Sequence, residues 1–233
     1  MNKNTFETEI KKVFTNINRD FFSTVEIYKS FLQDYNKKIN LTRLDGEDKI
    51  YGDYFYESII PYKDLDFSNI KHVLDIGSGS GIPGVVLKLL YPHIELTIIE
   101  SNNKKVTFLN ELAKLLNIQI TVLANRAEDL ARQYNEQFDL VTSRAVASLQ
   151  AIVEISIRFV KIGGWLIEPK SQDINNEMNG ISIIVNKLGG SLVGINSFVS
   201  INGMTHNVVV IKKIQITNPK YPRSWNDITK GWK

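Results

Sequence analysis

From Lys71 onward, short apolar segments alternate with longer amphipathic ones. Candidate strands cover 72–76, 95–100, 118–123, 138–142 and 165–168, and candidate helices cover 83–91, 104–116, 147–160 and 175–188. Two further apolar segments, 191–199 and 206–214, flank Asn202-Gly203, a dipeptide typical of a hairpin turn. Alternating strands and helices indicate a mostly parallel sheet with both faces covered. The sequence therefore predicts an α/β fold with a seven-stranded sheet that ends in an antiparallel hairpin.

Residues 1–65 have a different pattern, in which apolar side chains recur at helix spacing. The aromatic residues that follow this spacing, Phe6, Phe14, Tyr28 and Tyr35, are interpreted as core. Ser23 to Glu26 has the spacing of a capping box, which predicts that a helix begins there, and a further helix is expected over 50–60. The predicted organisation is a helical extension (1–65) followed by an α/β domain (66–216).

Four glycines fall within eight positions between the first strand and the first helix, at Gly77, Gly79, Gly81 and Gly84. Glycine weakens the interior of an element, so this density needs a cause, and a ligand lying against bare backbone is one. In open α/β sheets, ligands bind at the carboxyl ends of the strands. The next strand ends at Glu100, whose carboxylate could accept hydrogen bonds from ribose hydroxyls. The pattern predicts a cofactor that contains adenosine.

Two cofactors compete for this segment. Residues 79–84 match G-x-G-x-x-G, the pattern of dinucleotide-binding proteins, in which the helix N-terminus holds a pyrophosphate. Asp75, at the end of the first strand, would repel a pyrophosphate and attract the ammonium group of a methionine moiety. Asp75 followed by the alternating glycines, with Glu100 on the next strand, favours S-adenosylmethionine over NAD(P).

Composition restricts the chemistry further. The chain has 233 residues, no cysteine and three histidines, so we expect no thiol nucleophile and no metal site. No apolar run approaches the ~18 residues of a membrane span, and the polar start does not resemble a secretion signal, which makes the cytoplasm the expected location.

The remaining methyl acceptors can be narrowed by elimination. Methylation of a pyrimidine 5-carbon usually needs a cysteine nucleophile, which this chain lacks. Enzymes that methylate exocyclic amines commonly carry a proline-rich turn after the fourth strand, where this chain has Ser143-Arg144-Ala145-Val146. An acceptor that is already nucleophilic, such as a purine ring nitrogen, needs alignment and no general base.

The carboxyl-terminal segment, 217–233, is treated as a separate basic tail. From Lys212 to Lys233 the chain has six basic residues and one acidic residue, with aromatic residues between them. Such a segment is a candidate for nucleic-acid contact. The alternative is a tail whose aromatic residues pack back on the domain, and the sequence leaves both open.

Several segments together resemble the glucose-inhibited division protein B family, bacterial 16S ribosomal RNA guanine-N(7) methyltransferases, from about residue 24 to 223. They are Asn40-Leu41-Thr42, the segment 74–84 (LDIGSGSGIPG), Arg126-Ala127-Glu128, the segment 143–149 (SRAVASL) and Lys220-Tyr221-Pro222-Arg223. The resemblance implies a class I S-adenosylmethionine-dependent methyltransferase fold with a helical amino-terminal extension. It also implies that the acceptor is a guanine in the decoding-region loop of the small-subunit RNA.

The resemblance also assigns site residues. Those expected to bind the cofactor are Asp75, Gly77, Gly79, Gly81, Ile82, Glu100, Ala127, Glu128 and Arg144. Those expected to contact RNA are Asn40, Arg144, Lys170, Lys220 and Arg223. Arg144 has the central role because it is expected where cofactor and acceptor meet. The alternative role for Arg144 is a structural ion pair.

The chain departs from the family pattern at Tyr54 and Glu57, where the family usually has His and Asp. The reaction implied is methyl transfer to rRNA by a protein that acts as a monomer on the small ribosomal subunit. Two alternatives stay open: an NAD(P)-dependent oxidoreductase, and a non-catalytic RNA-binding protein on the same fold.

Overall fold

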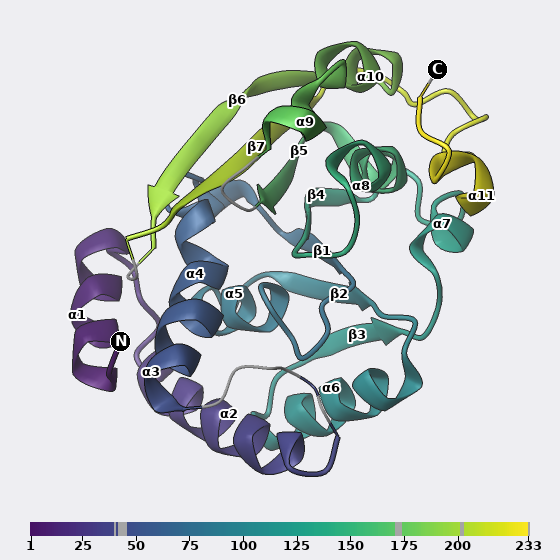
Figure 1. Ribbon diagram of the computed structural model, residues 1–233. Coiled ribbons are helices and arrows are strands. Elements are labelled where there is room, and N and C mark those ends of the chain that lie inside the picture. Colours follow the sequence, from purple (N-terminus) through teal and green to yellow (C-terminus); the bar gives the residue numbers. More distant parts are fainter. Residues whose placement is uncertain (40, 42–45, 171–173, 201–202, 233) are drawn as a thin grey trace.

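The computed structural model describes residues 1–39, 41, 46–170, 174–200 and 203–232. Within them, seven strands form one sheet in the order β3-β2-β1-β4-β5-β7-β6 (Figure 1). The strands are β1 (His72–Ile76), β2 (Glu95–Ile99), β3 (Ile120–Leu123), β4 (Phe138–Ser143), β5 (Val160–Lys170), β6 (Gly190–Val199) and β7 (Thr205–Lys213). The first five strands are parallel, and β7 pairs antiparallel with both β5 and β6.

Helices lie on both faces of the sheet (Figure 1). The α-helices are α1 (Lys3–Val13), α2 (Phe21–Asn36), α3 (Glu47–Lys49), α4 (Glu57–Ile59), α5 (Gly84–Leu90), α6 (Asn103–Leu115), α7 (Ala127–Leu130), α8 (Leu149–Ser156), α9 (Asn175–Met178), α10 (Ile181–Lys187) and α11 (Trp225–Ile228). A π-helical segment, η1 (Ile50–Tyr56), joins α3 to α4, and short 3₁₀ turns cover η2 (Ile60–Tyr62), η3 (Phe67–Asn69) and η4 (Ile157–Phe159). At its carboxyl end, each of β1, β2 and β4 leads into a loop that precedes a helix (α5, α6 and α8, respectively).

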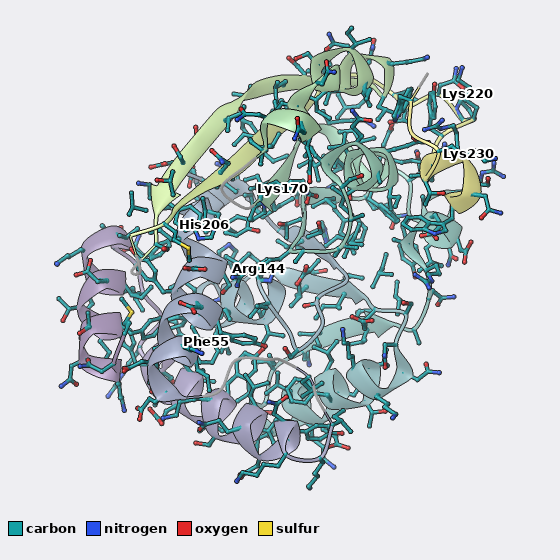
Figure 2. The ribbon with its side chains drawn as sticks, in the orientation of Figure 1. Phe55, Arg144, Lys170, His206, Lys220 and Lys230 are labelled. Atoms are coloured by element: carbon teal, nitrogen blue, oxygen red, sulfur yellow. The ribbon has the colours of Figure 1, made fainter. Side chains whose placement is uncertain are left out.

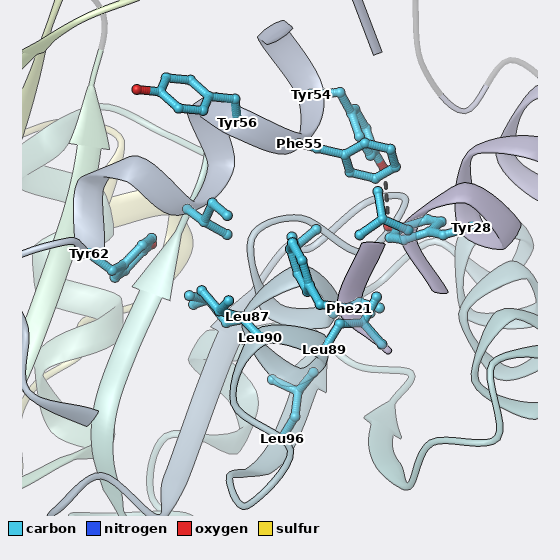
Figure 3. Close-up of a cluster of buried hydrophobic side chains, with 14 of the residues drawn as sticks. Phe21, Tyr28, Tyr54, Phe55, Tyr56, Tyr62, Leu87, Leu89, Leu90 and Leu96 are labelled. Atoms are coloured by element: carbon cyan, nitrogen blue, oxygen red, sulfur yellow. Dashed lines mark hydrogen bonds between the residues drawn. The ribbon is translucent and has the colours of Figure 1, made fainter. Parts of the chain in front are cut away.

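The helices before residue 65 share one hydrophobic core with the sheet. Phe21 and Tyr28 from α2, and Phe55 from η1, are fully buried in the same cluster as Leu87 of α5 and Leu96 of β2 (Figure 3). Burial of aromatic side chains on this scale contributes much of the stability of a domain. The amino-terminal helices are thus packed into the α/β domain.

A second cluster covers the opposite face, where α8 and α10 pack on β4, β5 and β6. Tyr221 and Ile228, from the carboxyl-terminal segment, are both buried in this cluster, and Trp232 packs against Tyr221 with ring centroids 5.3 Å apart. Tyr221 and Trp232 thus pack back on the domain, whereas Trp225 is 41% exposed, so only part of the tail follows the packing interpretation.

The alternation of strands and helices predicted from the sequence is confirmed, including the antiparallel closing hairpin. The predicted capping box is wrong, because α2 begins at Phe21. The hydroxyls of Ser23 and Thr24 donate to the carbonyl of Asp20, at 2.9 and 2.8 Å, and so bond back within the first turn.

Two further boundaries differ from the prediction. The sequence places Gly163-Gly164 after the helix predicted over 147–160, where this pair would close it. In the structure both glycines lie inside β5, where the register against β4 shifts between Phe138 and Leu140 and leaves room for extra residues. The helix expected over 175–188 is split into α9 and α10 at Gly180, which has a left-handed backbone. In the described part of the chain, no helix is long and apolar enough to span a membrane.

Candidate active site

The glycine-rich bend between β1 and α5 is tightly packed against the protein's own atoms. At Gly81 an added Cβ would lie 2.5 Å from the hydroxyl oxygen of Tyr28, and at Gly84 it would lie 2.7 Å from Oδ2 of Asp75. Gly79 is different, since the nearest atom to an added Cβ is the end of the Lys105 side chain, 3.8 Å away. Internal packing thus explains part of the glycine density, and Gly79 is where the bend offers open backbone.

Asp75 is the penultimate residue of β1, lies beneath this bend and is fully buried. Its Oδ2 accepts hydrogen bonds from Ser78 Oγ at 2.5 Å and from the amide of Gly84 at 2.8 Å. Its Oδ1 is buried and makes no hydrogen bond to the residues that the structure describes. Burial raises the pKa of Asp75 to about 6, and the nearby charge of Glu100 acts in the same direction. A cation beside this carboxylate would favour its ionised form.

Glu100 follows β2 and lies against the same bend. Its Oε2 accepts from the amide of Gly79 at 3.0 Å, and its Oε1 accepts from the amide of Asn102 at 2.9 Å. Only 5% of Glu100 is exposed. The structure therefore brings Asp75, the glycine bend and Glu100 together, as the sequence predicted, while their roles toward a cofactor stay predictions.

The other predicted cofactor residues lie around this bend. Ile82 is in the bend itself and packs against the first core cluster. Ala127 and Glu128 begin α7, just beyond the carboxyl end of β3, with Ala127 buried and Glu128 partly exposed. The amide of Glu100 donates to the carbonyl of Leu123 at 3.1 Å, which places the ends of β2 and β3 side by side.

Arg144 follows β4 and reaches toward η1 and α4. Its Nη2 donates to the carbonyl of Asp53 at 2.8 Å and lies 3.4 Å from Oε2 of Glu57, and its Nη1 donates to the carbonyl of Tyr54 at 3.4 Å. Burial lowers the pKa of Arg144, and Glu57 opposes this effect. The ion pair considered from the sequence is thus present, and its geometry is loose.

A cleft of about 280 Å³ opens beside Arg144. We call it the acceptor cleft, and it is lined by Glu57, Arg144, Ala145, Pro169, Lys170, Glu177, Phe198 and His206. Figure 2 shows Arg144, Lys170 and His206 close together near the carboxyl ends of the central strands. Lys170 Nζ lies 2.7 Å from Glu177 Oε2 and donates to the carbonyl of Ala147 at 3.0 Å. Lys170 lines the cleft as an ion-paired residue.

Two tyrosines tie the amino-terminal helices to the bend: Tyr28, interpreted as core from its helical spacing, and Tyr54, a departure from the family pattern. The Tyr54 hydroxyl donates to the carbonyl of Ser80 at 2.8 Å and contacts its Oγ at 2.6 Å, and the Tyr28 hydroxyl donates to the same carbonyl. The two hydroxyls are 3.3 Å apart, the contact dashed in Figure 3. Helical periodicity could identify both rings as buried, but it could not show where their hydroxyls point.

Two of the residues predicted to contact RNA, Lys220 and Arg223, are not brought to the cleft, and a third, Asn40, lies outside the described residues. Lys220 is at the far end of the molecule from Arg144 in Figure 2, with its ammonium 5.1 Å from the centre of the Tyr221 ring. Arg223 forms an ion pair with the buried Glu154, with Nη2 and Oε2 2.7 Å apart. An RNA contact by these residues stays a prediction, and Arg223 already has an internal partner.

Among the described residues, no group of three or more His, Cys, Asp or Glu side chains is arranged to hold a metal ion.

Comparison with known proteins gives matches over most of the chain. The family described as rRNA small subunit methyltransferase G matches residues 22–201. A protein of Ureaplasma parvum serovar 3 named ribosomal RNA small subunit methyltransferase G is 43% identical over 99% of both chains. A protein of the same name from Clostridium kluyveri is 35% identical over 97% of this chain and 96% of its own.

Solved structures show a similar fold at low sequence identity. M. jannaschii TYW2 in complex with AdoMet has a TM-score of 0.54 at 18% identity, covering 68% of this chain and 77% of that one. The StiE O-MT structure has a TM-score of 0.55 at 15% identity, covering 69% of this chain and 74% of that one.

Proposed function

Because the chain belongs to the rRNA small subunit methyltransferase G family, we propose that it transfers a methyl group from S-adenosylmethionine to a guanine of small-subunit rRNA. Family membership carries the reaction class. The proposal adds the acceptor atom, the guanine N7, and its position in the decoding-region loop. One observation carries it: the acidic glycine bend and the acceptor cleft are neighbours, since Ala145 lines the cleft and the next residue, Val146, packs on Gly77.

The residues at the bend fit S-adenosylmethionine. The buried Asp75, with one oxygen unbonded to the described residues, suits the cationic amino-acid end, directly or through water. Glu100 suits the ribose hydroxyls, and Ala127 with Glu128 would meet the adenine. When bound, the cofactor supplies a methyl group attached to a positively charged sulfur. The protein's part is to hold that group against the acceptor and exclude water.

The acceptor needs no general base in this proposal. The N7 lone pair forms the new bond to the methyl carbon while the carbon–sulfur bond breaks toward sulfur, and no proton leaves the ring nitrogen. The chain has to align the guanine and stabilise the positive charge that its ring acquires. Arg144 is proposed to position the base where cofactor and acceptor meet, through an acceptor atom or a phosphate of the RNA.

A dinucleotide cofactor is not favoured by this geometry. A pyrophosphate would require free amides at the start of α5, but the Gly84 amide is already bonded to Asp75. The Gly79 amide is likewise bonded to Glu100. Two carboxylates occupy the donors that would hold phosphate, which argues against the NAD(P)-dependent alternative.

The proposal includes two expectations about the setting of the reaction. Ribosomal subunits are assembled in the cytoplasm, so we place the enzyme there. We also propose that the protein acts as a monomer, and light scattering coupled to gel filtration tests this.

The function is tested with small-subunit RNA, and with whole subunits, from cells that lack this activity. The protein is incubated with labelled S-adenosylmethionine, and the RNA is then cleaved with borohydride and aniline, which cut at N7-methylguanine. We expect label in the RNA and one new cleavage site in the decoding-region loop. No label in either form of the RNA would rule out the methyltransferase, and label without cleavage would rule out N7 as the acceptor. Asp75→Asn serves as the matched variant, with weaker cofactor binding expected.

A further inference from the structure

Glu57 occupies the acceptor cleft without a close partner for its carboxylate. Only 7% of the residue is exposed. Its Oε2 lies 3.4 Å from Arg144 Nη2, and its Oε1 lies 3.8 Å from Nε2 of His206. Both distances exceed the roughly 2.7–2.9 Å of a charge-assisted hydrogen bond. The cleft therefore holds a buried carboxylate that is near two nitrogens and tightly bonded to neither.

His206 is the second incompletely satisfied group. Its Nε2 is buried and makes no hydrogen bond within the described part of the chain. Its ring stacks on Phe198, its cross-strand partner from β6, with centroids 5.3 Å apart and an interplanar angle of 18°. This pair gives the cleft a flat aromatic surface next to polar atoms, a combination that suits a planar heterocycle with hydrogen-bonding edges.

The other acidic residue of the cleft has its partners. Oε2 of Glu177 lies 2.7 Å from Lys170 Nζ, and it also accepts from the amide of Leu149 at 2.7 Å. Glu177 thus holds the loop after Arg144 in place. Of the two carboxylates that line the cleft, Glu57 is the more buried and the more loosely paired.

The cleft is also correctly placed relative to the bend. The carbonyl of Tyr54 accepts from Arg144, while the hydroxyl of the same residue bonds to Ser80 in the bend. Glu57 is three positions further along the chain and faces Arg144 from the cleft side. A base bonded to Glu57 would lie in a cleft adjacent to the bend, because Ala145 lines the cleft and Val146 packs on Gly77.

We propose that the acceptor guanine enters this cleft and that Glu57 selects it by accepting hydrogen bonds from N1–H and the 2-amino group. This inference rests on the proposed function. Enzymes that act on a flipped base read it through its Watson–Crick edge, and N7 lies on the other side of the purine. Adenine has an acceptor at N1 in place of a donor, so a carboxylate would repel it. Glu57 thereby discriminates guanine from adenine.

The same contact would assist the chemistry. Methylation at N7 makes the ring cationic, so N1–H and the 2-amino group become stronger donors as the reaction proceeds. A hydrogen bond to a carboxylate that strengthens in the transition state lowers the barrier, whereas one of constant strength does not. Glu57 would contribute to the rate without taking a proton.

The electrostatics of the cleft are consistent with this role. Burial raises the pKa of Glu57 to about 7, Arg144 lowers it and Asp53 raises it. His206, Lys170 and Glu177 are the other titratable groups that line the cleft. Two N–H donors from a bound guanine would stabilise the ionised carboxylate and complete its hydrogen bonding.

The test combines a change in the protein with a change in the RNA. Inosine in place of guanosine removes only the 2-amino group from the acceptor. We expect wild-type kcat/KM for labelled methyl transfer to fall about tenfold on RNA with inosine at the mapped position. Glu57→Ala should lower kcat/KM about 10- to 100-fold on guanosine RNA. Inosine should lower the kcat/KM of this variant little further, because the carboxylate that accepts from the 2-amino group is already absent.

Controls separate recognition from folding. Glu57→Gln keeps one acceptor oxygen and a similar shape, so it should fold and show an intermediate rate, with cofactor affinity unchanged. Glu95→Gln removes an exposed carboxylate at the opposite end of β2 and should leave the rate unchanged.

The outcomes are distinct. If inosine lowers the rates of wild type and Glu57→Ala by the same factor, or if Glu57→Gln matches wild type on both RNAs, Glu57 does not contact the guanine edge. A loss confined to cofactor affinity would overturn the assignment as well. If wild type methylates neither RNA, the proposed function itself fails, a result that the variants cannot mimic.

Discussion

The molecule contains two arginine–glutamate pairs of opposite character. At the far end, Arg223 and Glu154 make several short contacts, at 2.7, 3.0 and 3.2 Å, and the Arg223 amide adds a fourth at 2.8 Å. At the acceptor cleft, Arg144 and Glu57 are 3.4 Å apart, and the guanidinium is shared with two backbone carbonyls.

We interpret this difference as that between an ion pair that stabilises the fold and one that we propose to bind the acceptor base. In the first pair, one carboxylate takes the guanidinium in a fork geometry, which is the strong arrangement for these groups. In the second, both partners keep capacity for a ligand. A buried charged pair with loose geometry is expensive to maintain, and a binding site is where such a cost is found.

The largest effect is expected from Arg223→Ala. Glu154 is completely buried, so removing its partner leaves an uncompensated carboxylate. We expect the free energy of unfolding in urea to fall by about 3 kcal/mol. The kcat/KM of the protein that remains folded should be close to wild type. A large loss of methyl transfer with normal stability would instead make Arg223 an RNA contact, as first predicted from the sequence.

Arg144→Ala should affect the rate of methyl transfer more than stability. We expect methyl transfer to slow about 100-fold, because an aligned guanidinium at the junction of cofactor and acceptor is lost. Stability should fall less than in Arg223→Ala, since Glu57 can take up a proton near neutral pH. Single-turnover rates and urea titrations on the same preparation measure both quantities, and an unaltered rate would remove Arg144 from the site.

The pH dependence of stability should expose the cleft carboxylate. The pKa of Glu57 is raised to about 7 from 4.5, so the folded state binds more protons than the unfolded state between these values. Stability therefore decreases as pH rises through this window. Glutamine does not titrate, so Glu57→Gln should lose less stability as pH rises. Between pH 5 and pH 8 its free energy of unfolding should fall by about 1 kcal/mol less than that of the wild type. Parallel curves for the two proteins would show that Glu57 titrates normally.

The smallest effect is expected at the exposed tail. If Lys220 contacts a phosphate, as the sequence predicted, Lys220→Ala should weaken RNA binding a few-fold and lower the slope of log affinity against log salt by about one. Fluorescence anisotropy with labelled RNA over a range of salt concentrations measures both. Identical slopes for variant and wild type would confine the role of the tail to packing.

Local sequence patterns were sufficient to predict the sheet and the glycine-rich bend. Each strand is a short apolar run, and Asp75, the glycines and Glu100 fall at strand ends, so position along the chain implied position at one edge of the sheet. The boundary errors arose where a tertiary contact overrode a local signal. Gly163 and Gly164 look like a helix stop, but the bulge in β5 uses them.

The acceptor cleft was largely beyond sequence reasoning. Arg144 follows β4 and Lys170 ends β5, so both could be anticipated at strand ends. Glu57 and His206 come from α4 and β7, and only the folded chain brings them together. Likewise, nothing in Arg223 indicates an internal partner, because the burial of Glu154 depends on how α8 packs.

The convergence of Tyr28 and Tyr54 on the carbonyl of Ser80 has a consequence for engineering and for evolution of this architecture. The helical segments that carry these residues, α2 and η1, cannot be exchanged for those of another methyltransferase as a detachable module. A graft would have to preserve both phenols or redesign the loop they hold, because that loop relies on distant sequence for its shape. Diversification of the amino-terminal segment is therefore constrained by the catalytic half of the protein, although the two are separated by dozens of residues.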